Sequence, residues 1–242
     1  MHESDWRWCF WSTTIFDAVL QLLVLASISE TYMPVLKQRA EILERKLVSM
    51  DIGATTQALR LALRRPFYML WTQPVLQLSS VLSGVTFGIL YMIISTIHML
   101  FMSVYGQSHR AAALHYISLG IGFVAGAQLM GLTTDWLYRR DSQPKPELRI
   151  KLLLPSIVVA GLGLLCLGWS AKARTHWIVP DIGLVLFSAG YQCATQCQNA
   201  YIINVYGPKG WSASANAGIW AVKSIAGLCF PLFAPALYRS HG

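Results

Sequence analysis

Charged residues are scarce in this sequence, and that scarcity excludes most soluble folds. Lys, Arg, Asp and Glu make up 12% of the 242 residues, whereas apolar residues make up 55%. A soluble domain is typically about one quarter charged. A helix that crosses a bilayer needs about 20 predominantly apolar residues, and six such runs fill most of the chain. The composition therefore predicts an all-α integral membrane protein in contact with the lipid bilayer, with no separate soluble domain.

Signatures of catalysis and of cofactor binding are also missing. The sequence has no His-Glu-x-x-His, Gly-x-Ser-x-Gly, P-loop or Cys-x-x-Cys motif, so we expect neither an enzyme nor a bound cofactor. His98, His109, His115 and His176 lack the spacing of metal ligands on one helix face. Solvated or headgroup-level histidines are favoured over a metal site.

Cysteines are few, and none lies in a loop that a disulfide framework would use. The apolar runs contain them within or at their edges: Cys9, Cys166, Cys193, Cys197 and Cys229. We therefore expect small buried side chains, and for Cys193 and Cys197 packing is favoured over metal or redox chemistry.

The net charge of +8 is gathered in the connections between apolar runs, where membrane orientation accounts for it. Nucleic-acid binding is not expected.

The apolar runs predict six transmembrane helices, at 9–29, 69–97, 114–134, 152–171, 177–199 and 213–235. The polar segment 30–65 separates the first two, and 40–50 could form a short surface helix. Connections after the first, third and fifth helices hold thirteen Lys and Arg, whereas the opposite set, with both termini, holds five. The positive-inside rule places the first set in the cytoplasm. Both termini are therefore predicted to be extracytoplasmic.

Two ionisable residues fall inside expected helices, where a charge costs about 2.5–3.5 kcal/mol on insertion scales. Lys223 lies about 15 Å into the last helix and Asp17 about 12 Å into the first, at 1.5 Å per residue. A proton or substrate pathway is one interpretation, with Lys223 facing a polar cavity. The alternative is an inter-helix ion pair or a side chain that reaches the membrane surface.

Polar side chains also cluster on the fifth expected helix. Tyr191 and Gln198 follow helical spacing with Asn199 beside them, and Asn204 lies further on. This face would line a substrate pathway, or its side chains would only hydrogen-bond neighbouring helices. The Gly-x-x-x-Gly steps at 84–88 and 122–126 predict close helix packing.

A charged segment at 131–140 separates the third and fourth expected helices. We interpret it as a loop at the membrane surface, in which Asp135 and Arg139 can pair across one helical turn and Gly131 allows close helix approach. The pattern Gly131-x-x-x-Asp135-x-x-x-Arg139-Arg140 resembles the loop signature of the major facilitator superfamily. Segments 6–11, 30–34, 65–67, 72–74, 146–149, 176–180 and 230–233 resemble fungal drug:proton antiporters of that superfamily, many encoded beside secondary-metabolite genes.

The resemblance implies a partial fold of that superfamily, matching helices six to eleven of twelve. Residues 1–30 would be the last helix of the N-terminal half, 31–66 the cytoplasmic central loop, and 67–242 an incomplete C-terminal bundle. Gly131, Asp135, Arg139 and Arg140 would form a cytoplasmic gate.

The implied function is proton-coupled efflux of small organic molecules, such as drugs, toxins or secondary metabolites, from the plasma membrane. We expect no obligate protein partner. The alternative is a non-transporting or accessory membrane protein from a truncated gene.

Overall fold

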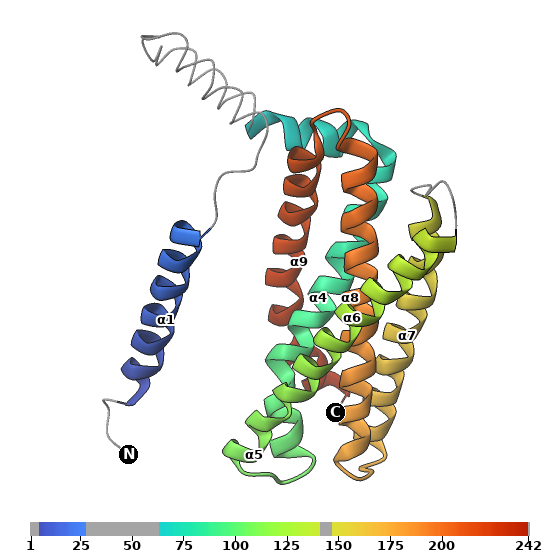
Figure 1. The fold of residues 1–242 in the computed structure, drawn as a ribbon. Coiled ribbons are helices and arrows are strands. Elements are labelled where there is room, and N and C mark those ends of the chain that lie inside the picture. The colour runs from blue at the N-terminus through green and yellow to red at the C-terminus, as the bar shows by residue number, and fades with distance from the viewer. Residues whose placement is uncertain (1–4, 28–62, 141–146, 242) are drawn as a thin grey trace. The chain divides into compact units, whose positions relative to one another are not determined.

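The computed structural model describes residues 5–27, 63–140 and 147–241, and these form helices joined by turns, with no strand among them (Figure 1). The predicted surface helix at 40–50 lies outside the described residues. The chain divides into two units, Met1–Thr56 and Gln57–Gly242, each taken by itself below. The first contains α1 (Asp5–Ser27).

The second unit is a helix bundle. Its helices are α4 (Pro74–Ser103), α5 (His109–Leu114), α6 (Tyr116–Arg140), α7 (Glu147–Lys172), α8 (Ile178–Tyr206) and α9 (Ser212–His241). With α1, the described part of the chain has six helical spans long and apolar enough to cross a membrane. This confirms the predicted all-α membrane fold.

The second helix does not begin at residue 69 as predicted. Residues 63–72 form a separate helix, and α4 begins at Pro74 after the extended residue Gln73. Proline lacks a backbone N–H and fits the first turn of a helix, while it disfavours helical backbone in the residue before it. In Figure 1 the helix at 63–72 runs across one end of the bundle, and Pro66 contacts the backbone of α9 at Gly218.

The third predicted helix is longer than its apolar run and is broken near its start. The short helix α5 precedes it, His115 forms the junction, and α6 continues to Arg140. The interpretation of 131–140 as a loop is therefore wrong. After Gly131 the segment contains no glycine or proline that would end a helix, so it forms the last turns of α6.

Glycines set how closely these helices pack. A Cβ atom on Gly126 of α6 would lie 2.9 Å from Ala189 Cα of α8, and one on Gly190 would lie 2.5 Å from Ala160 N of α7. Gly88 of α4 lies instead against the Phe230 side chain of α9. Both Gly-x-x-x-Gly predictions are confirmed. The bundle therefore contains a group of α6, α7 and α8 with backbone-to-backbone packing, and a pair of α4 and α9 packed through side chains.

Two clusters of buried apolar side chains hold the bundle together. One joins α4, α6 and α8 around Phe101, Leu119 and Phe187, and the other lies toward the start of α4 around Leu76 and Ile202. Large apolar side chains also face outward, including Trp169 and Leu228. An apolar outer surface suits a helix bundle surrounded by lipid.

Candidate functional site

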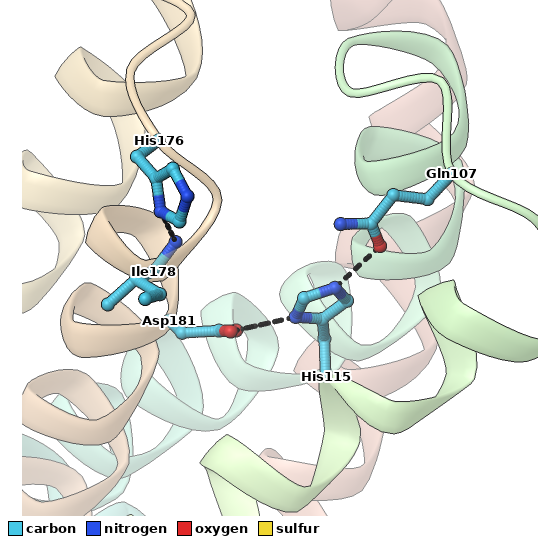
Figure 2. A network of polar contacts seen from close by, with 5 residues as sticks. All are labelled: Gln107, His115, His176, Ile178 and Asp181. Atoms are coloured by element: carbon cyan, nitrogen blue, oxygen red, sulfur yellow. Dashed lines mark hydrogen bonds and ion pairs between the residues drawn. The ribbon is translucent and has the colours of Figure 1, made fainter.

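Both ring nitrogens of His115 lie within hydrogen-bonding distance of another side chain. Its Nδ1 lies 2.9 and 2.8 Å from the two carboxylate oxygens of Asp181, and its Nε2 lies 2.7 Å from the Gln107 amide oxygen. Figure 2 shows the ring held between these two side chains. Among the described residues, His115–Asp181 is the single ion pair.

Local backbone geometry brings these three residues together. Gly106 adopts φ +63°, and the next backbone N–H, that of Gln107, donates to Phe101 O at 3.2 Å, which closes the end of α4. His115 lies at the α5–α6 junction. Asp181 lies in the first turn of α8, where the helix dipole favours negative charge. Three separate chain segments therefore meet at one imidazole.

The His115 ring is enclosed by aromatic side chains. It stacks on Phe101 with ring centroids 3.5 Å apart and 4° between the planes, and Trp177 presents its edge at 5.9 Å. His115 is only 6% exposed, so the prediction of a solvated or headgroup-level histidine is wrong for this residue.

Sequence analysis missed Asp181. An acidic residue within an apolar run is the feature that could have identified it.

The other described histidines lie outside this cluster. His98 Nε2 lies 3.2 Å from His109 Nδ1 at the same end of the bundle, and His176 Nδ1 lies 3.5 Å from the Ile178 N–H. Within the described ranges, no group of three or more His, Cys, Asp or Glu side chains could hold a metal ion.

Lys223 lies in the α4–α9 pair and is 2% exposed. Its Nζ lies 4.8 Å from the centroid of the Trp220 ring and 5.7 Å from that of Phe87. Within the described bundle Lys223 does not face the expected polar cavity, because the side chain is buried and two aromatic rings lie beside its ammonium. An inter-helix ion pair is absent, since no acidic residue in the described part of the chain pairs with Lys223. The side chain is also buried and not extended toward a surface of the bundle. Cation–π attraction is the interaction that the structure provides.

Gln198 connects the two packing groups. Its Oε1 accepts a hydrogen bond from Ser83, and its Nε2 donates to Ser79 O at 2.7 Å. The amide of α8 is thereby bound to two residues of α4, which sequence analysis did not identify. Tyr191 is 6% exposed and packs near Phe187, with ring centroids 6.3 Å apart. Both side chains therefore make packing contacts, and a substrate pathway along this face stays a prediction.

The remaining polar residues of α8 are more accessible. Asn199 is half-buried and Asn204 is exposed. Cys193 donates to Gly126 O at 3.1 Å, and Cys197 lies 3.3 Å from Met130 Sδ. The cysteines therefore contribute to the α6–α8 contact, as the packing interpretation predicted.

A cavity of about 260 Å³ lies where α4, α7 and α8 meet. Its lining is mostly apolar, with the side chains of Ser79, Gln198 and Tyr201 carrying polar groups: Val75, Leu78, Ser79, Leu82, Leu153, Cys197, Gln198 and Tyr201. An apolar hollow with few polar groups has the character of a small-molecule site.

The expected gate residues lie along the last turns of α6. The predicted Asp135–Arg139 ion pair is absent from the described residues, and Arg140 instead lies over the Trp136 ring, 5.3 Å from its centroid. A Cβ on Gly131 would meet no atom within 4 Å, so the expected close approach does not occur within the described bundle. Asp135 and Arg139 are exposed.

Asp17 belongs to α1, in the first unit. It accepts a hydrogen bond from Gln21 Nε2 at 2.7 Å, one turn along the same helix, and both side chains are exposed within that unit. An amide one turn away satisfies part of the hydrogen-bonding capacity of a carboxylate within the span.

Comparison with known proteins identifies the family. A model of the Major Facilitator Superfamily matches residues 1–231. The chain belongs to the major facilitator superfamily. This membership confirms the resemblance inferred from the loop signature, and it makes transport across a membrane the activity of the family to which the chain belongs.

Fungal members of the superfamily match nearly the whole chain. "MFS-type transporter oryF" of Aspergillus oryzae is 33% identical, covering 99% of this chain and 52% of oryF. "Probable efflux pump mfs2" of Aspergillus flavus is 36% identical, covering 99% of this chain and 60% of mfs2. The chain spans about half the length of the curated relatives it matches. No solved structure matches it.

Proposed function

We propose that this protein exports small organic molecules across a membrane in exchange for protons. Its relatives include a protein named as an efflux pump, and the cavity among α4, α7 and α8 is mostly apolar with few polar groups. Such a lining suits hydrophobic organic molecules and discriminates weakly between them. The proposal concerns the activity of a whole transporter. This chain spans about half the length of the curated relatives it matches.

The observation that carries the proposal is the burial of Lys223. The residue is 2% exposed in a membrane-length helix and has no acidic partner among the described residues. A charge inside a membrane span is expensive, and such charges characteristically mark a substrate or proton pathway. We assign Lys223 to that pathway, with Asp17, Tyr191, Gln198, Asn199 and Asn204 as further members.

We infer the orientation from charge. The thirteen-to-five distribution of Lys and Arg supports a cytoplasmic location for the end of α6 and an outer location for α5. In this orientation Gly131, Asp135, Arg139 and Arg140 form the cytoplasmic gate, and both termini face outward. We assign the protein to the plasma membrane. We also propose that residues 1–30 are the last helix of the N-terminal half, 31–66 the cytoplasmic central loop and 67–242 the incomplete C-terminal bundle.

The test is efflux from proteoliposomes containing the purified chain, with an imposed pH gradient and a rhodamine dye as the probe. We expect dye movement that follows the gradient and is lost in Lys223→Ala. Lys172→Ala is the matched control, because Lys172 is exposed at the end of α7. Absence of dye movement by the wild-type chain contradicts export by this chain. Unchanged efflux in Lys223→Ala contradicts the role of Lys223.

A further inference from the structure

We propose that His115, Asp181 and Gln107 form the site at which this protein takes up a proton from the outer side of the membrane. The inference rests on the proposed function, because it names a binding site for the exchanged proton. It also extends that proposal, which assigned no proton-binding residue at this end of the bundle.

Two hydrogen-bonding arrangements satisfy the His115 ring, and they differ by one proton. A carboxylate only accepts hydrogen bonds, so Nδ1 carries a hydrogen toward Asp181 at 2.8 Å in both. When Gln107 presents its oxygen at 2.7 Å, Nε2 also carries a hydrogen and the ring is an imidazolium. When the amide turns through half a rotation, its NH₂ donates to Nε2 and the ring is neutral. A proton therefore enters or leaves Nε2 while every buried polar atom keeps a partner.

Aromatic rings and one carboxylate surround the imidazole. Phe101 covers one face of the ring and Trp177 lies at its edge. On the elements packed around the ring, the acidic partner is Asp181, whose side chain is 15% exposed and opens the cluster to solvent. Other titratable groups at this end are Tyr105, whose hydroxyl donates to Ser170 O, His176, the His98–His109 pair, and the exposed Arg110, Lys172 and Arg174.

Protonation changes the strength of a contact between separate helices. Gln107 belongs to the α4–α5 turn, His115 to the α5–α6 junction and Asp181 to α8. An imidazolium bonded to a carboxylate is a charge-assisted pair, and loss of the proton weakens it. Proton uptake therefore tightens the contact among α4, α6 and α8 at this end, and proton release loosens it. That dependence links proton binding to opening of one end of the bundle.

The first test measures protonation directly. ¹⁵N-histidine-labelled full chain in detergent micelles gives signals that distinguish imidazolium from neutral imidazole, and His115→Asn identifies the His115 signal. We expect that signal to change form with pH, and Asp181→Asn to alter this change, because the carboxylate that accepts the hydrogen bond from Nδ1 is replaced. His98→Asn is the control and leaves it in place. A His115 signal that keeps one form throughout the folded pH range overturns the proposal.

The second test measures coupling in proteoliposomes. We expect His115→Asn and Asp181→Asn to abolish the dependence of dye efflux on outer pH while retaining dye binding, measured by fluorescence anisotropy. Asp181→Glu retains a carboxylate and restores the dependence, which a purely structural role does not predict. His98→Asn again serves as the control.

The outcomes separate the two proposals. Absence of dye transport by the wild-type chain contradicts the proposed function, while the NMR titration still decides whether His115 binds a proton. Wild-type transport with an unchanged outer-pH dependence in both His115→Asn and Asp181→Asn overturns the proton site and leaves the export function intact. If His115→Asn does not fold, the comparison of Asp181→Asn with Asp181→Glu decides the same question.

Discussion

The α6–α7–α8 group and the α4–α9 pair differ both in packing and in the way each accommodates a buried ionisable group. In the first, glycines bring helix backbones into contact, and His115 of the α5–α6 junction is matched by the Asp181 carboxylate. In the second, Gly88 faces the Phe230 side chain, and the Lys223 ammonium lies beside the Trp220 and Phe87 rings with no acidic partner among the described residues. Side chains can change rotamer while backbones cannot yield. We infer that the α6–α7–α8 group is rigid and gives its buried ionisable side chain, His115, an acidic partner. The α4–α9 pair is more adaptable, and its buried Lys223 has no acidic partner among the described residues.

Gly126→Leu should have the largest effect, because a side chain at Gly126 collides with the α8 backbone at Ala189. Overpacking of this kind costs about 3 kcal/mol of folding free energy. The measurement is thermal unfolding in detergent, followed by tryptophan fluorescence. Gly131→Leu is the matched control, since a Cβ there meets nothing within 4 Å. Equal destabilisation by both variants would contradict backbone packing as the basis of the rigid group.

Asp181→Asn should rank second, because it removes the charged acceptor of a buried histidine. Hydrogen bonds to charged groups contribute about 1.5–3 kcal/mol, so the same unfolding measurement should detect the loss. Asp135→Asn is the control, as Asp135 is exposed and has no ion pair among the described residues. A loss that is the same in a His115→Asn background would show that the two side chains are not coupled.

Gln198→Leu should have a smaller effect and tests the connection between the two groups. Polar contacts between membrane helices average about 0.6 kcal/mol and reach about 1.7 kcal/mol. The hydrogen bonds to Ser83 and Ser79 would be lost, whereas Gln196→Leu alters an exposed residue of the same helix. Gln196→Leu destabilising more than Gln198→Leu would exclude the connection.

Trp220→Leu should have the smallest effect on stability. It removes the nearer aromatic face from the Lys223 ammonium, and a cation–π contact contributes about 0.5–1 kcal/mol at exposed sites. The contribution is isolated by comparing Trp220→Leu in wild-type and Lys223→Met backgrounds. The same loss in both backgrounds means that the ammonium does not interact with the ring.

The apolar runs predicted the helices because hydropathy is a local property that each span carries by itself. Their ends were less predictable, since α6, α7 and α8 extend beyond the apolar runs into polar residues. The start of α4 at Pro74 was missed, although a proline fitted to the first turn of a helix is a local signal that could have found it. The Gly-x-x-x-Gly steps likewise predicted close packing, although their partners on α8 and α9 depend on the tertiary fold.

The candidate site was less accessible to sequence reasoning. His115 and Asp181 lie 66 residues apart, and no helical periodicity relates residues on different helices. Lys223 was singled out because a charge within an apolar run is conspicuous, but its burial was not predicted, and one of its aromatic neighbours, Phe87, lies on a different helix. The Asp135–Arg139 pairing was wrong because sequence spacing permits a contact without requiring it.

The most direct test of the central claim is a joint measurement on Lys223→Met, thermal stability in detergent and dye efflux under a pH gradient. Lys223 has no carboxylate partner in the described chain and is buried, so replacing it with an apolar side chain of similar length removes a buried charge. The account predicts stability that is unchanged or higher, together with loss of efflux. Lower stability with efflux unchanged would contradict it and make Lys223 a structural residue.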